Sequence, residues 1–215
     1  MTERTSQREY IPGLGKHFLT PLYDVAHHVF GLRRIHQEMI TLADLRAGHR
    51  ILDVGCATGN LLRSAGKRYP EVELVGLDPD PRALANAGRK FRRAGLDVRL
   101  DRGFAQELPY PDDSFDRVFS SLMLHHLDSE SKNALLTEVR RILRPEGRLI
   151  LADAVVDEGG KGAGHGGMRK HLHDNIADAV NHRIAAAGFT VDPTHRMPLR
   201  VGGTVGIEVA RPAEG

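Results

Sequence analysis

Short apolar runs alternate with longer amphipathic segments from about residue 50 to the end of the chain. Runs such as RILDV at 50–54 are short, mostly apolar and followed by turn residues, which favours buried strands. The longer segments carry apolar residues three and four positions apart, as Leu135, Leu136 and Val139 do, which favours helices. Regular alternation of strand and helix is typical of parallel strands with helical crossovers. The sequence therefore predicts an α/β fold with a doubly wound, mostly parallel sheet.

The same pattern gives the bounds of seven expected strands and four expected helices. The strands are Arg50–Val54, Val72–Leu77, Asp97–Leu100, Phe115–Ser120, Arg148–Ala152, Phe189–Val191 and Thr204–Ala210. The helices are Asn60–Arg68, Pro81–Gly95 with Asp80 as its N-cap, Ser131–Leu143, and about Leu172–Ala187. Residues 1–49 are expected to form a helical arm, and residues 50–215 the α/β domain itself. A glycine-rich run at 159–167 is expected to be a flexible loop.

Composition narrows the class of protein further. A chain of 215 residues, 40% hydrophobic and 27% charged, suits a single globular domain. No stretch approaches the roughly 18 uninterrupted apolar residues of a spanning helix. The first ten residues are charged where an export signal needs an apolar core, so we expect a cytoplasmic protein without membrane insertion. The single cysteine, Cys56, excludes an intramolecular disulfide framework and a multi-cysteine zinc module.

The net charge of +2 is small for a protein that binds nucleic acid. One basic cluster lies within the expected second helix: Arg89, Lys90, Arg92 and Arg93. We interpret it as a solvated helix face, since it is short and has no interleaved aromatic residues. The expected partner is therefore a small molecule and not a nucleic acid, and the oligomeric state is left open.

The strongest local signal is the segment 52–60, LDVGCATGN, in which a strand runs through a glycine turn into a helix. Ligands of open α/β sheets bind at the carboxyl ends of such strands. The segment lacks the three glycines of a dinucleotide fingerprint and the Gly-Lys-Ser/Thr ending of a P-loop. Asp53 suits a ligand with an ammonium group, and Asp78, which ends the second strand, suits ribose hydroxyls. This pattern indicates a nucleoside that carries positive charge and no phosphate.

Four stretches in the expected order resemble the class I S-adenosylmethionine-dependent methyltransferases, especially the ubiquinone/menaquinone-type C-methyltransferases. They are LDVGCATGN at 52–60, LVGLDPDPRAL at 74–84, ELPYPDDSFDRVFSSLMLHHL at 107–127 and EVRRILRPEGRLILAD at 138–153. The resemblance implies a Rossmann-like seven-stranded methyltransferase domain at 50–215. It also implies a lid formed by residues 1–49 and the 155–175 loop. The cofactor it implies is S-adenosyl-L-methionine, with S-adenosyl-L-homocysteine as product.

The resemblance also assigns cofactor-binding residues by position. Asp53 and the glycine-loop residues would hold the methionine end, Asp78 the ribose and Pro79 the adenine, while Ser120 and Ser121 would offer backbone near the amino group. The loop residues concerned are Gly55, Cys56, Ala57 and Gly59.

Phe104 and Ala105 stand where the family usually has Asp-Ala, which is a departure from its pattern. An aspartate there accepts a hydrogen bond from the exocyclic amine of adenine, and a phenylalanine cannot. Two interpretations stay open. Either Phe104 packs on the base, or it points into the core and another group such as Gln106 meets the amine.

For catalysis, the resemblance favours His125 as general base or orienting residue, opposite Tyr23 or Tyr10 of the arm. His165, His171, His173 and Asp174 have no diagnostic metal-ligand spacing, and Asp153 lacks a carboxylate partner at the fourth strand, so we expect no metal.

The expected function is methyl transfer from S-adenosylmethionine to a small-molecule acceptor. Two alternatives remain: a non-methylating cofactor-binding protein on the same scaffold, and an NAD(P)-dependent oxidoreductase, which the failed fingerprint disfavours.

Overall fold

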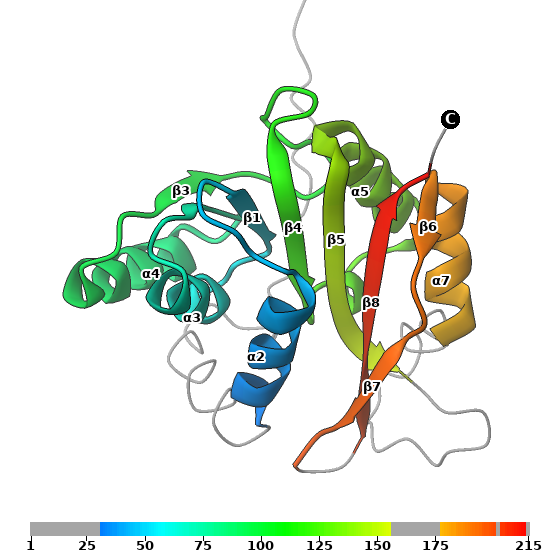
Figure 1. Cartoon of the computed structure of the whole chain (residues 1–215), viewed down its shortest axis with the longest axis horizontal. Helices are drawn as coiled ribbons and strands as arrows, with labels where there is room; N and C mark the ends of the chain where they lie inside the picture. Colours follow the sequence, from blue (N-terminus) through cyan, green and yellow to red (C-terminus); the bar gives the residue numbers. More distant parts are fainter. Residues whose placement is uncertain (1–30, 156–176, 201–202, 214–215) are drawn as a thin grey trace, which may run out of the picture.

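A computed structural model describes residues 31–155, 177–200 and 203–213 of the chain. The strands form one mixed sheet in the order β3-β2-β1-β4-β5-β8-β6, with β7 paired to β8 (Figure 1). β1 to β5 run parallel to one another, and β8 is antiparallel to β5, β6 and β7. The strands are β1 Arg50–Val54, β2 Glu73–Asp78, β3 Arg99–Arg102, β4 Phe115–Ser121, β5 Leu143–Val155, β6 Phe189–Val191, β7 His195–Pro198 and β8 Thr204–Pro212.

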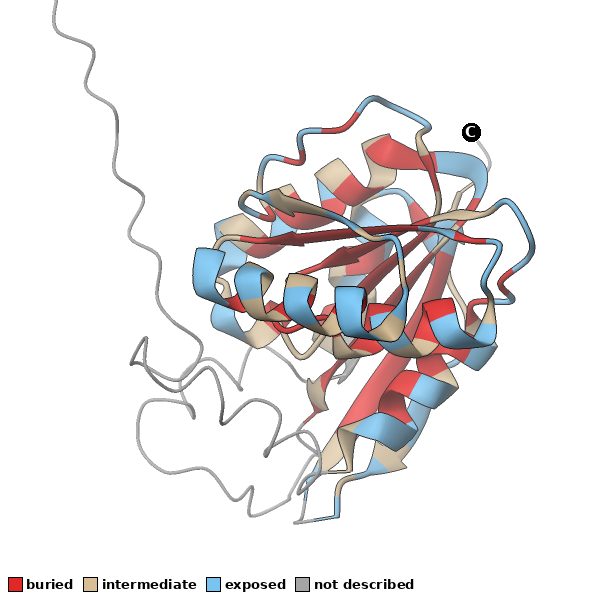
Figure 2. Cartoon of the chain, turned by 90° about the vertical axis from the view of Figure 1, so that its left-hand side faces the viewer, coloured by how far each residue is buried: buried red, intermediate tan, exposed pale blue. Residues whose placement is uncertain are grey.

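Helices cover both faces of this sheet, as the edge-on view of Figure 2 shows. They are α2 Leu32–Leu42, α3 Asn60–Arg68, α4 Pro81–Ala94, α5 Ser129–Ile142 and α7 Ala177–Ala186, with a short 3₁₀ turn, η2, at Leu124–His126. Alternate residues of one strand belong to different cores: Ile51 packs with residues of α2, α3 and α4, whereas Leu52 packs with residues of α5 and α7. Successive side chains of a central strand point to opposite faces of the sheet, and helices bury both faces. For this reason the central strands are apolar along most of their length.

Most predicted elements are confirmed, and the α/β class with them. β1 and α3 have the predicted bounds, and α4 begins after Asp80, whose side chain accepts a hydrogen bond from Arg82 N. Gly95 ends α4 with a φ of +66°. These boundaries follow from local capping residues, which can be recognised in the sequence.

Other boundaries differ from the prediction. β3 lies two residues later than expected, β5 is longer at both ends, and α5 begins at Ser129, with Asp128 as its cap. β7 is an eighth strand that the sequence did not indicate. The first residues of the expected helix at 172–187 lie outside the described residues, as does the glycine-rich run, and α7 begins at Ala177. No helix in the described ranges is long and apolar enough to cross a membrane.

Candidate functional site

The glycine loop joins β1 to α3 at the carboxyl end of the central strands. Gly55 N and Cys56 N both donate hydrogen bonds to Leu77 O, at 2.8 and 3.1 Å, which fold the loop against β2. Gly55 and Gly59 have φ values of +75° and +74°, and Ala57 one of +46°. The loop therefore needs backbone conformations that favour glycine, and it presents main chain to the space above the sheet.

Neighbouring side chains pack directly on the loop glycines. A Cβ at Gly55 would meet Met123 Cγ at 2.6 Å, and one at Gly59 would overlap the ring of Phe91. On the other side, Lys90 Nζ donates to Thr58 Oγ1 at 2.9 Å and to Asn60 Oδ1 at 3.1 Å. Lys90 is therefore not part of a purely solvated helix face, as the sequence interpretation had it, because it fastens α4 to the glycine loop.

Asp53 is buried near the end of β1, with 2% of its surface exposed. Its Oδ1 atom has no hydrogen-bond partner among the described residues. Burial, and then the negative charge of Asp78, raise the pKa of the Asp53 carboxyl well above its ordinary value. A buried polar atom without a partner is rare in folded proteins, so this position is suited to a cationic or hydrogen-bond-donating ligand.

Asp78 ends β2 and is held in place by main-chain donors. Its Oδ2 accepts a hydrogen bond from Ala57 N at 2.9 Å, and its Oδ1 accepts one from Asp80 N at 2.9 Å. Burial raises the pKa of the Asp78 carboxyl, and these two donors oppose that rise. Each carboxylate oxygen keeps a further lone pair for a ligand hydroxyl.

A crevice opens between the glycine loop and α2, and Asp53, but not Asp78, is among its lining residues. Its lining includes Asp53, Gly55, Cys56 and Ala57 of the predicted set, and also Ser121 at the end of β4. The remaining lining residues are Leu32, His36, Thr58, Asn60 and Leu61. The structure thus brings five of the predicted cofactor-binding residues to one crevice.

His36 is a crevice residue that the sequence reasoning missed. It is buried on α2 with 8% exposure, and its Nε2 lies 3.2 Å from Ser121 Oγ, 85 residues away in the chain. Ile35 and Met39 mark the buried face of the same helix. A histidine next to these apolar positions was the available signal, because a polar residue on a buried helix face calls for a partner.

Ser120 and Ser121 are the last two residues of β4. Ser120 is 2% exposed, and its Oγ has no hydrogen-bond partner among the described residues. Ser120 pairs in register with Val54 on β1, next to Asp53. The two unpartnered oxygens therefore lie on opposite faces of the sheet. Ser120 shares the face of Val54, which packs with α5 and α7, whereas Asp53 lines the crevice beside α2.

His125 and Asp153 form a close pair on the β4–β5 side of the sheet. His125 Nδ1 lies 2.7 Å from Asp153 Oδ1, and His125 N donates to Asp153 Oδ2 at 3.0 Å. Ala154 N donates a third hydrogen bond to Asp153, and the His126 ring stacks at 4.0 Å from that of His125. The backbone and ring contacts fix the imidazole in one orientation, with Nε2 as its other ring nitrogen. Such an arrangement can accept a proton.

Phe104 does not point into the core, so that interpretation is wrong. It is 37% exposed and is the one exposed large hydrophobic residue in the part of the chain that the structure describes. Gln106 Nε2 donates to Ser131 Oγ at 2.9 Å, which ties this amide to α5. Ala105 is buried at 9% exposure, and Pro79 O accepts a hydrogen bond from Arg102 Nε at 3.3 Å.

Several predicted residues lie outside the described part of the chain. They are Tyr23, Tyr10, His165, His171, His173 and Asp174. Within the described ranges, no group of three or more His, Cys, Asp or Glu side chains is placed to hold a metal ion.

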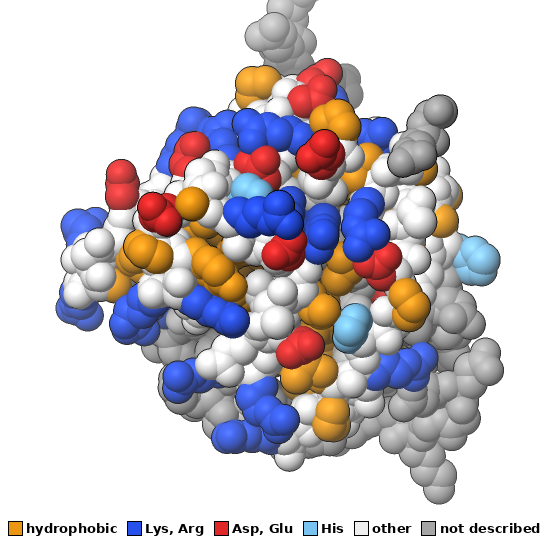
Figure 3. Space-filling model, in the orientation of Figure 1, with side chains coloured by type: hydrophobic (Ala, Val, Ile, Leu, Met, Phe, Trp, Pro, Cys, Tyr) orange, Lys and Arg blue, Asp and Glu red, His pale blue; other side chains and the backbone are white. Residues whose placement is uncertain are grey.

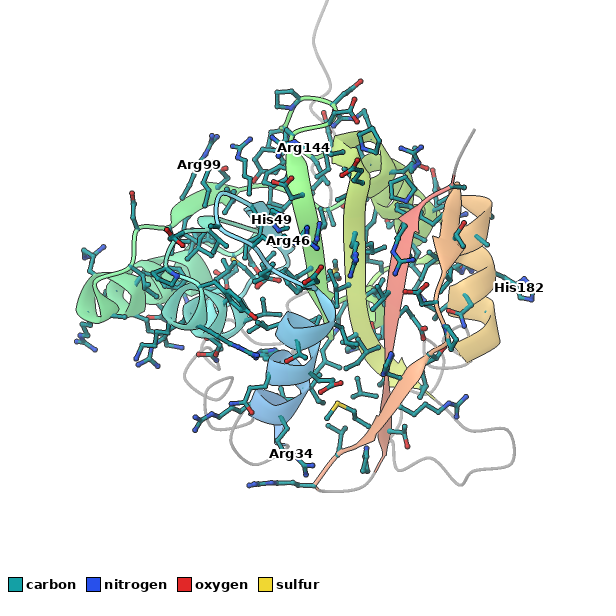
Figure 4. All side chains as sticks on the ribbon, viewed as in Figure 1. Arg34, Arg46, His49, Arg99, Arg144 and His182 are labelled. Atoms are coloured by element: carbon teal, nitrogen blue, oxygen red, sulfur yellow. The ribbon has the colours of Figure 1, made fainter. Side chains whose placement is uncertain are left out.

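Basic side chains on the visible face alternate with acidic ones (Figure 3). Figure 4 labels several of them away from the crevice, among them Arg46, Arg99 and Arg144. Each forms an ion pair, with Asp44, Asp101 and Asp116 respectively. These arginines do not form an unneutralised cluster, and the crevice is the feature that concentrates buried polar groups.

Comparison with known proteins agrees with this geometry. Residues 51–147 match the family described as methyltransferase domain. The chain is 30% identical over 200 residues to the demethylmenaquinone methyltransferase of Thermus thermophilus, covering 80% of this chain and 90% of that protein. Several other curated relatives match over only about half of their own length.

Solved structures share the fold at low sequence identity. The [4+2]-cyclase SpnF superimposes with a TM-score of 0.74 at 22% identity, covering 85% of this chain and 82% of that one. Phospholethanolamine N-methyltransferase 2 of Haemonchus contortus, a complex with S-adenosylhomocysteine, gives a TM-score of 0.79 at 14% identity, covering 94% and 58%. The sequence relatives, together with this fold, establish that the chain belongs to the class I S-adenosylmethionine-dependent methyltransferases that act on small molecules.

Proposed function

We propose that the crevice binds S-adenosylmethionine with its methionine end above β1 and its nucleoside above β2 and β3. The unpartnered Asp53 Oδ1 supports this proposal most directly. A buried carboxylate without a donor has an unfavourable environment, and an ammonium or sulfonium group close by would make it favourable. The sheet order supports the orientation, since β1, β2 and β3 are neighbours about 4.8 Å apart.

The residues around the crevice fit each part of this cofactor. Asp53 Oδ1 supplies a buried hydrogen-bonding atom that has no described partner, and Ser121 of the adjacent strand β4 lines the same crevice. Asp78 offers two oriented oxygens to the ribose hydroxyls. Gly55 and Gly59 let the main chain approach the ligand, as their positive φ values require. When bound, S-adenosylmethionine supplies an electrophilic methyl group.

His125 is the residue we propose as general base. Its Nδ1 is held by Asp153, which leaves Nε2 to take the proton that the acceptor loses when it becomes a nucleophile. The buried Asp153 carboxylate then stabilises the imidazolium that forms. His36, which lines the crevice from α2, orients Ser121 through the contact between Nε2 and Oγ. These residues orient the acceptor and remove its proton. Alignment of the reacting groups is the main contribution that an in-line displacement needs from a protein.

The acceptor we propose is a small hydroxylated aromatic compound. The Thermus thermophilus relative, over nearly its whole length, is a demethylmenaquinone methyltransferase. Loss of a phenolic proton raises electron density at both oxygen and ring carbon, so a base such as His125 serves either O- or C-methylation. Leu32 and Leu61 give the crevice apolar walls that suit such a ring.

The test is turnover of S-adenosylmethionine with a panel of reduced demethylnaphthoquinones and substituted phenols. The expected result is formation of S-adenosylhomocysteine and of a methylated product that depends on the acceptor, identified by mass spectrometry. Binding of S-adenosylhomocysteine without turnover of any acceptor in the panel would contradict the proposed acceptor class. Failure to bind S-adenosylhomocysteine would contradict the cofactor assignment itself.

A further inference from the structure

Phe104 occupies the place from which the protein reads the nucleobase, if the cofactor lies as proposed. Gly103 N donates to Asp78 O at 3.3 Å, and Asp78 pairs in register with Arg102. Phe104 therefore lies two residues after the end of β3, in a segment whose main chain is bound to that of Asp78, the residue that we assign to the ribose. Phe104 keeps 37% of its surface exposed, so its ring is available to a base attached to that ribose.

The nearby carboxylates already have partners. Asp101 Oδ2 accepts a hydrogen bond from the Tyr110 hydroxyl at 3.0 Å and pairs with Arg99. Asp80 caps α4 through Arg82 N, and Asp78 binds two main-chain amides. At the position where a carboxylate would receive the exocyclic amine, this chain presents an aromatic ring.

We propose that the nucleobase subsite recognises the purine through its ring and not through the amine at position 6. Phe104 supplies an apolar, polarisable surface that contacts a purine whatever its substituent at that position. The site then accepts nucleoside thioethers in which the 6-amine is absent. This inference rests on the proposed function, because it presumes that the cofactor binds in the crevice.

The probe is an analogue of S-adenosylhomocysteine in which hydrogen replaces the amine at position 6. All ring nitrogens are retained, so any main-chain donor that binds them is unaffected. The wild-type protein is expected to bind the analogue and S-adenosylhomocysteine with dissociation constants within about threefold of each other. A hydrogen bond from the amine to a charged acceptor would instead separate them by about 10- to 100-fold.

The complementary test is a variant that should gain the ability to distinguish S-adenosylhomocysteine from the analogue. In the Phe104→Asp variant the carboxylate can receive the amine, so S-adenosylhomocysteine should bind at least about tenfold more tightly than the analogue. The Phe104→Leu variant is the matched apolar control. It should bind both ligands several-fold more weakly than the wild type, because it loses the aromatic ring. The two dissociation constants should still lie within about threefold of each other, because the variant gains no hydrogen-bond acceptor.

The outcomes separate the two proposals. If the wild type binds S-adenosylhomocysteine but binds the analogue tenfold or more weakly, another group reads the amine and this inference is wrong. Equal binding of both ligands by a folded Phe104→Asp variant also overturns it, since Phe104 would then not lie at the amine. If neither ligand binds the wild type, the cofactor assignment fails and this inference fails with it. Should the aspartate variant not fold, the wild type and Phe104→Leu still decide the question.

Discussion

Two groups of buried polar atoms at the carboxyl end of the sheet differ in how fully they are satisfied. On the central strands β1 and β4, Asp53 Oδ1 and Ser120 Oγ have no hydrogen-bond partner within the described part of the chain. They are two of the three such side-chain atoms in the described residues. On the β5 side, Asp153 accepts three contacts from His125 and Ala154.

The difference indicates that Asp53, which lines the crevice, is satisfied only when a ligand binds, whereas the pair of His125 with Asp153 is already satisfied in the free protein. Unsatisfied buried atoms cost stability until something binds them, so they mark where recognition occurs. A satisfied pair costs little in the free protein and holds a reactive side chain in one orientation. Substitutions in the two groups should therefore have opposite effects on stability and separate effects on binding and turnover.

The largest expected effect is on turnover. His125→Ala should lower kcat by about 10²- to 10⁴-fold, the usual worth of a general base, because Nε2 no longer accepts the proton of the acceptor. The measurement is steady-state turnover with whichever acceptor the panel described above identifies. Affinity for S-adenosylhomocysteine should stay within about threefold of the wild type, and His126→Ala is the neighbouring control, expected to retain most of the activity. Unchanged turnover in His125→Ala would exclude the base assignment.

A second substitution, Asp53→Asn, should act on binding and stability in opposite senses. Calorimetric titration should show S-adenosylhomocysteine binding weakened by about 100-fold, because the ammonium group loses a charged acceptor. The melting temperature of the ligand-free variant should rise, by roughly 2–4 °C for each kcal/mol gained, since a poorly solvated carboxylate is removed. If Asp53→Asn bound S-adenosylhomocysteine as tightly as the wild type, or melted at a lower temperature, the proposed difference between Asp53 and Asp153 would be wrong.

The pH dependence of the ligand-free protein should reflect the same carboxyl. Burial raises the pKa of Asp53, so the folded state binds this proton more tightly than the unfolded chain does. Its contribution to stability is complete below the ordinary value of 3.8 and is lost as pH rises through the higher folded value. Melting temperatures measured across this window should therefore fall less with pH in Asp53→Asn than in the wild type. Parallel curves for the two proteins would contradict this origin.

In the satisfied group, Asp153→Asn should lower stability. The amide replaces one accepting oxygen by a donor that faces main-chain or imidazole N–H groups, at a cost of about 1–3 kcal/mol. For a chain of this size that corresponds to a melting temperature lower by several degrees, checked by scanning calorimetry. A higher melting temperature, as expected for Asp53→Asn, would show that the two groups do not differ.

The smallest effect is expected for Ser120→Ala. It removes a buried hydroxyl that has no described partner, so the stability of the ligand-free protein should change by less than about 0.5 kcal/mol or increase slightly. Binding of S-adenosylhomocysteine should stay within about threefold of the wild type, because the Ser120 side chain lies on the opposite face of the sheet from the crevice. A clear loss of stability would instead show that Ser120 is satisfied within the fold.

Elements bounded by local chemistry could be predicted from the sequence, and elements defined by pairing could not. The N-cap of Asp80 and the left-handed turn at Gly95 fix α4 within a few residues of chain. β3 is a half-exposed edge strand of polar residues, RLDR, so no apolar alternation marked its position. β7 exists because it pairs with β8, and its own residues are largely exposed.

The candidate site also contains residues that a local pattern predicts and contacts that depend on the tertiary fold. Asp53 and Asp78 could be predicted because they end strands that the pattern identified. The contact between His36 and Ser121 joins residues 85 apart, and the pair of His125 with Asp153 joins residues 28 apart. Such contacts depend on which strands become neighbours and on how α2 lies across them, neither of which a local pattern contains.

The central claim is that Asp53 Oδ1 is left without a partner in the fold because the ligand supplies one. A crystal structure of the complex with S-adenosylhomocysteine tests it most directly. The expected result is the ligand in the crevice, with its amino group bound to Asp53 Oδ1 directly or through one water, at about 2.7–3.2 Å for each hydrogen bond. A ligand bound elsewhere, or one in the crevice that leaves this oxygen still unpaired, would contradict the claim.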